Sequence, residues 1–362
     1  MILKTLGRTT SLTATAAFGL GAVAFTLNAL GMSQTLVFVV AALALAALAT
    51  LIGQGTEQLG HRYGPRTTGI LQSALGNLPE LFISIFALQA GLVVVVQTAL
   101  IGSILANTLL VLGLAFLLGG LKHGTQQFHA PAVRTMATLL VLAVAALAIP
   151  TLATAPGAPD AGHATDLSVI VSLVLLAIFA ASIPFSIGGG PGASAGVEES
   201  DIEHIWPMGL TITVLLLGAA GAALTSDLFV EALRPTMASL RMSEAFVGLV
   251  IVAIAGNAVE NVVGVQMAMR NKPELATSLI LNSSLQVAIA LTPALVLISW
   301  VVGGGALTLV LSPLLLGAVA LSAILAALIV FDGESTWLEG LALLGLYVII
   351  AASVWYGPPI HA

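Results

Sequence analysis

Apolar runs of about 20 residues follow one another along the chain, separated by short polar segments. A helix of 20 residues is about 30 Å long, which matches the hydrocarbon core of a bilayer. Lipid offers no hydrogen bonds to an exposed backbone, so long unbroken runs indicate helices and not the strands of a barrel. The pattern predicts about eleven transmembrane helices, over residues 11–30, 34–54, 66–90, 97–119, 132–151, 166–187, 207–227, 243–269, 274–301, 305–330 and 336–356.

The composition agrees with this pattern. Of 362 residues, 59% are hydrophobic and 7% are charged, and the mean hydropathy is +1.11. A soluble domain has about 25% charged residues. The predicted fold class is therefore an all-α polytopic membrane protein. We expect it in a bacterial inner membrane, with the lipid bilayer and inorganic cations as partners and no nucleic acid. The chain has no cysteine, which excludes disulfides and thiolate metal sites.

A segment rich in glycine and proline divides ten of the predicted helices into two groups of five. Residues 189–206 are expected to form a flexible, acidic cytoplasmic linker. The helices within 34–188 form the first half and those within 207–356 the second. Residues 1–31 hold an extra N-terminal helix, interpreted as retained and not as a cleaved signal peptide. An odd number of helices in each half inverts the second half relative to the first, as in many secondary transporters.

The basic residues indicate the orientation. If the N-terminus is cytoplasmic, all Lys and Arg residues except Arg234 and Arg241 lie on the cytoplasmic side. This is the distribution that the positive-inside rule expects. We therefore predict a cytoplasmic N-terminus, and the odd number of helices places the C-terminus outside.

The pattern Gly-Asn-x-x-Glu occurs twice, each time within a predicted membrane span. The first copy runs from Gly76 to Glu80 and the second from Gly256 to Glu260. Both carboxylates are expected near the bilayer centre, where a charge costs at least about 2.5 kcal/mol. A single Gly-Asn pair would indicate only tight helix packing. Two copies with an acid at matching depth indicate an ion site.

The spacing beyond the motifs is also repeated. The separation between Glu80 and Ser103 equals the separation between Glu260 and Ser283. A spacing kept over a helix, a loop and the start of the next helix predicts two copies of one two-helix unit. The binding site of such transporters lies at the midplane, between the repeats.

Glu80 and Glu260 are the only acidic residues deep in the predicted spans, and no Lys or Arg is expected there to neutralise them. Two carboxylates in a low-dielectric site then require protons or a bound cation. We infer that both bind H⁺ and a metal cation alternately. Hard cations such as Ca²⁺ prefer carboxylate, amide and other oxygen ligands. The predicted neighbouring ligands are Asn77, Asn257, Ser103, Ser283, Ser284 and Gln286.

The backbone near the two acids is expected to be irregular. Pro79 cannot donate to the carbonyl of Leu75, which frees a carbonyl one turn from Glu80. Gly76 and Gly256 allow the chain to bend or to approach closely. Each motif asparagine lies three residues before its glutamate, which predicts that the amide and the acid share one helix face.

Plainer roles are open for several residues. The hydroxyls of Ser103 and Ser283 can bond back to their own helix backbone, and Gln286 can form an interhelical hydrogen bond. Glu57 and Asp227 lie near predicted helix ends and are interpreted as interfacial caps, with a place along the ion path as the alternative. The acidic run of the linker is interpreted as a solvated segment, with a weak Ca²⁺ sensor as the alternative. It comprises Glu198, Glu199, Asp201 and Glu203.

Longer stretches around these motifs resemble the cation/proton exchanger (CAX) family of the calcium/cation antiporter superfamily. They include Leu-Gly-Asn-Leu-Pro-Glu-Leu and Gly-Asn-Ala-Val-Glu and cover residues 56–59, 75–88, 102–107, 240–248, 256–260 and 283–286. The resemblance implies eleven helices in two inverted repeats, with Glu80 and Glu260 holding the ion together with asparagines and serines. It also implies that the helices predicted at 34–54 and 207–227 slide as a pair. The chain departs from the family at Asn261, where many relatives have histidine.

The predicted function is a secondary active transporter that exchanges Ca²⁺ for H⁺ by alternating access and needs no cofactor. Two carboxylates can be neutralised by one Ca²⁺ or by two H⁺, which predicts an exchange near 1:2. Exchange of Na⁺, K⁺ or Mn²⁺ within the same superfamily is the alternative, and a passive channel is the alternative from another class. No hydrolytic motif such as a P-loop is present, so an enzyme is not expected.

Overall fold

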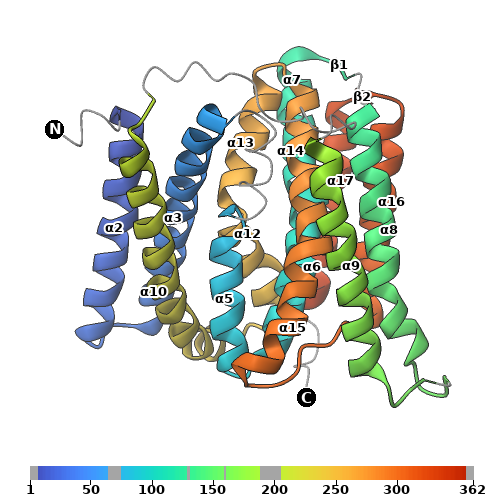
Figure 1. The fold of residues 1–362 in the computed structure, drawn as a ribbon, viewed down its shortest axis with the longest axis horizontal. Helices are drawn as coiled ribbons and strands as arrows, with labels where there is room; N and C mark the ends of the chain where they lie inside the picture. Colours follow the sequence, from blue (N-terminus) through green and yellow to red (C-terminus); the bar gives the residue numbers. More distant parts are fainter. Residues whose placement is uncertain (1–6, 64–74, 129–130, 159, 188–204, 356–362) are drawn as a thin grey trace.

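The computed structural model describes residues 7–63, 75–128, 131–158, 160–187 and 205–355 as a bundle of helices (Figure 1). A two-residue antiparallel pair, β1 (Gln126–Gln127) with β2 (Glu334–Ser335), joins two loops. The helices before the linker are α2 (Arg8–Ala29), α3 (Gln34–Tyr63), α5 (Leu78–Gln89), α6 (Val93–Leu105), η1 (Ala106–Val111), α7 (Leu112–His123), α8 (Pro131–Ala153) and α9 (Ala164–Ile187). Those after it are α10 (Met208–Leu240), α11 (Glu244–Phe246), η2 (Val247–Val252), α12 (Ala253–Gly256), α13 (Ala258–Met269), α14 (Pro273–Gln286), η3 (Val287–Leu291), α15 (Thr292–Val302), α16 (Pro313–Phe331) and α17 (Trp337–Trp355).

The predicted class, an all-α polytopic membrane protein, is confirmed. Within the described residues, nine helices are long and apolar enough to cross a membrane. A tenth span results if the bent pair Glu244–Gly256 and Glu260–Met269 is counted as one. The predicted span at 66–90 appears as the shorter apolar helix α5, and residues 64–74 lie outside the described residues. The number eleven stays a prediction. The linker residues 188–204, with the four acids of the acidic run, are likewise outside the described residues.

Two helices extend well beyond their predicted apolar runs. α3 continues to Tyr63 and α10 to Leu240. Hydropathy ends a run at the first charged residues, whereas a helix continues where Glu, Gln and Leu keep a high helix propensity. Glu57 and Asp227 therefore lie within helices, and their predicted position near helix ends was wrong. In contrast, α16 begins at Pro313 and not at 305. Glycines 303–305 adopt positive φ angles, and Ser312 in extended backbone caps the helix by accepting a hydrogen bond from the Leu315 N–H.

The helices that follow the two motifs, α5 and α13, are called the half-helices here. Each is 12 residues long and begins two residues after the glycine of its motif. In Figure 1, α5 runs from the middle of the bundle to its lower edge, and α13 runs from the middle to its upper edge. These opposite directions agree with an inverted repeat, although the layout of the two complete halves stays a prediction.

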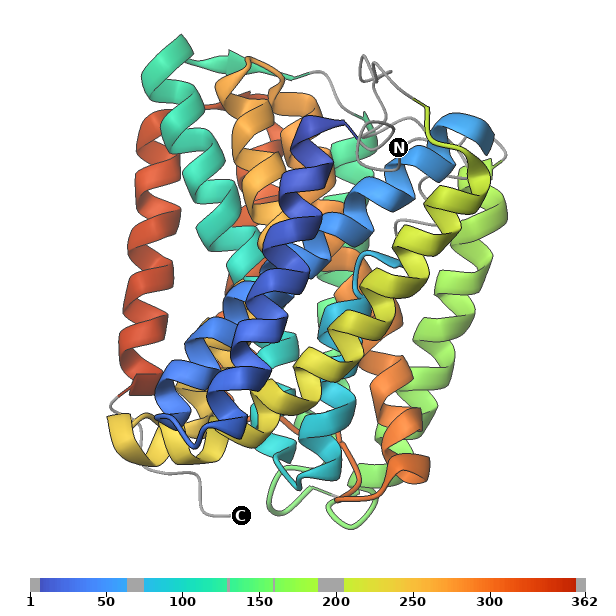
Figure 2. The same ribbon diagram turned by 90° about the vertical axis from the view of Figure 1, so that its left-hand side faces the viewer.

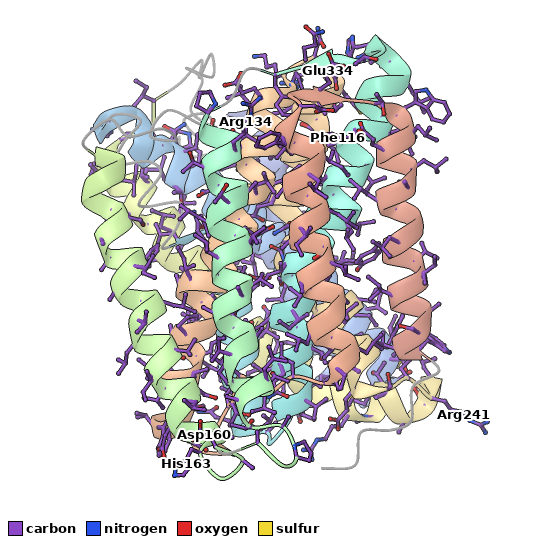
Figure 3. The ribbon with its side chains drawn as sticks, turned by 90° about the vertical axis from the view of Figure 1, so that its right-hand side faces the viewer. Phe116, Arg134, Asp160, His163, Arg241 and Glu334 are labelled. Carbon is purple, nitrogen blue, oxygen red and sulfur yellow. The ribbon has the colours of Figure 1, made fainter. Side chains whose placement is uncertain are left out.

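Charged side chains lie at two opposite ends of the bundle, called the upper and lower faces as they appear in Figure 1. Figure 3 shows Arg134 and Glu334 at the upper face, and Asp160, His163 and Arg241 at the lower face. The helices between them expose large apolar side chains, among them Leu142, Leu173, Leu216, Leu321 and Ile349. An apolar band between two charged rims matches a bilayer, and the protein is an integral membrane protein.

Helices α2, α3 and α10 form a layer at one side of the bundle, called the outer layer (Figures 1 and 2). α3 and α10 approach closely, since a Cβ added to Gly55 would lie 2.8 Å from the Leu215 side chain. Near the lower face the layer joins the main core, where the rings of Phe38 and Phe229 stack with centroids 4.6 Å apart. Near the upper face Leu51, Trp206 and Val214 form a separate apolar cluster. Midway along the helices, a further cluster packs against Leu75 and Phe82 and comprises Ala17, Leu48, Ile52 and Ala222.

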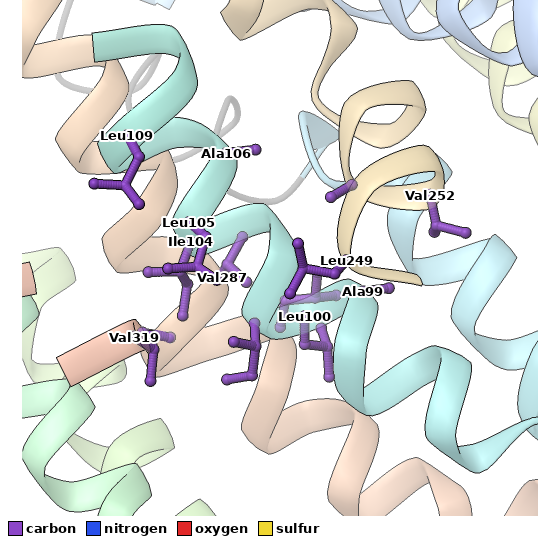
Figure 4. Packing of buried hydrophobic residues seen from close by; sticks show 14 of the residues in the cluster. Ala99, Leu100, Ile104, Leu105, Ala106, Leu109, Leu249, Val252, Val287 and Val319 are labelled. Carbon is purple, nitrogen blue, oxygen red and sulfur yellow. The ribbon is translucent and has the colours of Figure 1, made fainter. Parts of the chain in front are cut away.

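A close helix crossing in the core joins α6 to η2. Figure 4 shows Leu249 of η2 beside Ala99 and Leu100 of α6. A Cβ added to Gly102 would collide with the backbone of Leu249, and one added to Gly248 would collide with α6. The two glycines thus permit backbone contact at the level of the motifs.

We expect Gly102→Ala to lower the free energy of unfolding by about 1–3 kcal/mol, because the added methyl overpacks this crossing. Denaturant unfolding in detergent measures the change. Gly317→Ala on α16 is the matched control, because its added Cβ meets no atom within 4 Å. An equal loss of stability in both variants would contradict the steric explanation.

Candidate functional site

Both motif asparagines lie at the start of a half-helix, and at Asn257 the helix that carries the motif is broken. Asn257 is the N-cap of α13, and Asn77 is the N-cap of α5. The segment before Asn257 is bent by 64° relative to the half-helix that follows. Pro79 is the second residue of α5. A backbone N–H in the first turn has no partner within the helix, so its absence in proline costs no helical hydrogen bond. Glu80 is the third residue of α5, so its carboxylate lies in the first turn, where the helix dipole favours negative charge.

Glu80 is buried and is held by side chains from two other segments. Ser103 of α6 donates from Oγ to Glu80 Oε1 at 2.5 Å. Asn257 donates from Nδ2 to the same oxygen at 2.6 Å and also to Ser103 Oγ at 2.9 Å. The serine therefore bonds to the acid and not to its own helix backbone.

The contact between Glu80 and Asn257 corrects one prediction. The spacing within each motif had placed each asparagine on one helix face with its own glutamate. The chain breaks at Asn257, so the amide leaves the helical register and turns to Glu80 in the other half. The first motif differs, because Asn77 makes no side-chain hydrogen bond to any described residue.

Gly256 lies against Glu80. A Cβ built on Gly256 would collide with Glu80 Cγ and would lie 2.9 Å from Oε1 and 3.0 Å from Cδ. The side chain of the first motif therefore occupies the space that any larger residue at this position of the second motif would fill. The close approach predicted for this glycine is the reason that the two motifs meet.

Asn107 completes the network and was missed as a site residue. It lies in the π-helical turn η1, is fully buried, and donates from Nδ2 to Ser283 Oγ at 3.0 Å and to Asn257 Oδ1 at 3.3 Å. A signal was present in the sequence, because Asn107 is an amide in an apolar span four residues after Ser103. Residues four apart share a helix face. The repeat with an offset of 180 residues did not indicate Asn107, because the corresponding position in the second half is Val287.

Two buried oxygens of the network have no partner. Glu80 Oε2 and Asn107 Oδ1 accept no hydrogen bond from the described residues. The second carboxylate, Glu260, is 8% exposed and lies within electrostatic range of Glu80. Neither acid forms a salt bridge in the described part of the chain. The arrangement offers oxygen ligands to a proton or a cation, with no fixed positive charge in competition.

The other predicted ligands have different surroundings. Ser283 is buried and accepts the bond from Asn107, whereas Ser284 bonds back to the Ile280 carbonyl at 3.1 Å. Gln286 is buried at the last residue of α14. Asn261, the residue that follows Glu260, donates to the Ile254 carbonyl at 3.4 Å, and its Oδ1 is buried without a partner among the described residues.

The two predicted pathway residues do not join the network. Glu57 and Asp227 are exposed on α3 and α10 of the outer layer. In the described residues no group of three His, Cys, Asp or Glu side chains could hold a metal ion. A cation bound beside Glu80 and Glu260 would therefore be coordinated mainly by amide, hydroxyl and backbone oxygens in addition to the two carboxylates.

Comparison with known proteins extends over nearly the whole chain. The model of the family "sodium/calcium exchanger protein" matches residues 33–188 and 210–356. A Ca(2+)/H(+) antiporter of Synechocystis sp. is 34% identical over 355 residues, which cover 92% of this chain and 94% of the relative. The Ca(2+)/H(+) antiporter ChaA of Bacillus subtilis is 34% identical over 322 residues, covering 88% of this chain and 91% of the relative.

Solved structures give the same picture. The structure of native YfkE matches with a TM-score of 0.81 and 30% identity, covering 95% of this chain and 99% of that chain. The structure of an H+/Ca2+ exchanger, CAX, matches with a TM-score of 0.73 and 17% identity over 96% of this chain and 92% of that chain, which shows a shared fold.

These matches confirm the resemblance to cation/proton exchangers, and the relatives that they name are transporters and not enzymes. The family match includes both motifs and both halves on either side of the linker. The chain belongs to the sodium/calcium exchanger protein family.

Proposed function

We propose that the protein exchanges Ca²⁺ for H⁺ across the membrane by alternating access. The observation that carries this proposal is the pair of buried carboxylates, Glu80 and Glu260, at the meeting point of two half-helices. In an apolar bundle the pair has to be neutralised, and one Ca²⁺ or two protons can do so. The names of the relatives at 34% identity support Ca²⁺ and H⁺ as the exchanged ions.

The oxygen atoms around Glu80 suit a hard cation. Ca²⁺ takes six to eight oxygen ligands at about 2.3–2.6 Å. Glu80 Oε2 and Asn107 Oδ1 are buried acceptors without partners, and Ser103, Asn257 and Ser283 supply further oxygens. When Ca²⁺ is replaced by protons, a protonated Glu80 can donate a hydrogen bond, so the same groups serve both states.

The net reaction moves one Ca²⁺ out of the cytoplasm and two H⁺ in, with the N-terminus in the cytoplasm. Both carboxylates are protonated or Ca²⁺-bound whenever the protein changes the side of the membrane to which the site is open. The cycle is then electroneutral. The same change with an empty, doubly ionised site would leave two uncompensated charges in the apolar layer. This cost prevents transport of one ion without exchange for the other.

Purified protein in proteoliposomes is expected to accumulate ⁴⁵Ca²⁺ against its gradient when the lumen is acidic, since protons leaving the lumen drive the exchange. Na⁺, K⁺ and Mn²⁺ are tested as competitors. Because H⁺ and Ca²⁺ occupy the same carboxylates, the KM for Ca²⁺ should rise as the pH on the Ca²⁺ side falls. Uptake that only follows the Ca²⁺ gradient would indicate a channel. Uptake that changes with membrane potential would contradict the 1:2 exchange.

Glu80→Gln and Glu260→Gln should each abolish pH-driven uptake, more than 100-fold below the native rate, because one carboxylate cannot balance Ca²⁺. Glu274→Gln, an exposed acid in the first turn of α14, is the matched control and should transport normally. Size-exclusion chromatography and thermal unfolding establish folding. Near-native uptake by either motif variant would end the two-carboxylate mechanism.

Asn107→Ala should raise the KM for Ca²⁺ about tenfold, because it removes a buried oxygen ligand and leaves the groups that it bonds, Asn257 and Ser283, short of a donor. The neighbouring Thr108→Val is the control. Thr108 is also fully buried, but its hydroxyl bonds only to the Ile104 carbonyl of its own helix. An unchanged KM in Asn107→Ala, or an equal rise in the control, would remove Asn107 from the site.

A further inference from the structure

The half-helix α5 ends at the lower face in a tight turn with one carbonyl left for an outside donor. Gly91, with a φ of 72°, follows the C-cap Ala90. The backbone N–H groups of Gly91 and Leu92 donate to Leu88 at 2.9 Å and to Ala87 at 2.8 Å. The carbonyl of Ala90 instead accepts a hydrogen bond from Arg234 Nη2 at 2.6 Å. A cation at a helix C-terminus is favourable, because it faces the negative end of the dipole.

The opposite side of this turn is fixed by the core. Gly304, in the loop between α15 and α16, has a φ of 87°, and a Cβ added to it would collide with the Leu88 carbonyl. That loop is tied to α6 through Gln97, which donates from Nε2 to the Thr308 carbonyl at 2.8 Å. The end of α5 therefore belongs to the core on one side and touches Arg234 of α10 on the other.

The other half-helix, α13, also ends on a carbonyl that is contacted by basic side chains. Lys122 Nζ lies 2.9 Å and His123 Nε2 lies 2.8 Å from the Met269 carbonyl. Both residues belong to α7, which is packed in the main core. The two ends therefore differ in one respect. The contact at α13 stays within the core, whereas the contact at α5 joins the core to the outer layer.

The outer layer is closed onto the core at this end of the bundle. Near the lower face its side chains belong to the main core, whereas Leu51, Trp206 and Val214 near the upper face form a cluster of their own. Arg234 lies one and a half turns beyond Phe229, whose ring stacks on Phe38 within the closed part. A shift of α10 along its axis by half a turn would move Arg234 by about 2.7 Å and break its bond to Ala90.

We propose that Arg234 is a positioning residue for the exchange reaction, a latch that keeps the lower end of the α5 half-helix closed by bonding the Ala90 carbonyl. With the latch formed, Glu80 is shielded from the lower face and the site faces the upper side. Release of the latch accompanies the movement of α10 that opens the lower side. The proposal deepens the alternating-access function above and rests on it.

The chain contains no cysteine, so a single introduced thiol can report access to the site. Ser84→Cys places it on α5, one turn below Glu80, at a position that is 3% exposed. The rate of alkylation by a membrane-impermeant maleimide, added from either side of oriented vesicles, measures which side the site faces. Asp160→Cys, on an exposed loop of the lower face, identifies the membrane side to which that face belongs.

In the Ser84→Cys background, Arg234→Gln should raise the labelling rate from the lower side three- to tenfold and lower it from the upper side, since a charge-assisted but exposed bond is lost. Arg234→Lys, which keeps the charge and a hydrogen-bond donor on a shorter side chain, should give an intermediate rate. Arg241→Gln is the matched control. Arg241 is a second arginine at the end of the same helix, has no side-chain hydrogen bond to a described residue, and should leave both rates unchanged.

Equal labelling in Arg234→Gln and the parent, or an equal increase in Arg241→Gln, would overturn the latch. If Arg234→Gln does not yield folded protein, the Arg234→Lys comparison decides in the same way. Labelling does not require transport, so the two proposals can fail separately. A sidedness change without any Ca²⁺/H⁺ exchange would refute the proposed ions and keep the latch, whereas exchange with unchanged sidedness would refute the latch alone.

Discussion

The structure depends on one electrostatic constraint: two carboxylates lie in an apolar bundle in which no described residue provides a fixed positive charge for them. The surrounding residues reduce the cost without cancelling it. Glu80 is placed in the first turn of a half-helix and accepts two short hydrogen bonds on a single oxygen, while its second oxygen is left without a donor. A proton or a cation would supply the missing partner of this oxygen, and in the proposed exchange this need for a partner couples one ion to the other.

The constraint also explains why the helices break where they do. A continuous helix through Asn257 would keep its amide on the face of Glu260. The break releases the amide, which then bridges Glu80 and Ser103. The second half therefore supplies a hydrogen bond to the acid of the first half, and the first motif is not a complete site by itself.

Much of this arrangement is predictable from the sequence, and the reasons for the misses are physical. The apolar runs identify the helices. The repeated glutamates identify the centre of the bundle as the candidate site, because a charge within a membrane span is too costly to occur without a function. Contacts between segments far apart are not encoded in local spacing. The bond from Asn257 to Glu80 and the position of Asn107 depend on a chain break and on a π-helical turn, and neither changes hydropathy. Helix ends at Tyr63 and Leu240 were missed for the related reason that charged residues end an apolar run without ending a helix.

The contact of Gly256 with Glu80 has a consequence for how such a protein can diverge. The space beside the glycine is already filled by an atom from the other half, so the two positions share one volume. A methyl group at position 256 fits only if the acid at position 80 is shorter. If the acid is shortened first, a cavity remains next to a charge. Mutation at either position alone passes through a defective intermediate. The two halves carry the same motif, but at this point they can change only as a pair.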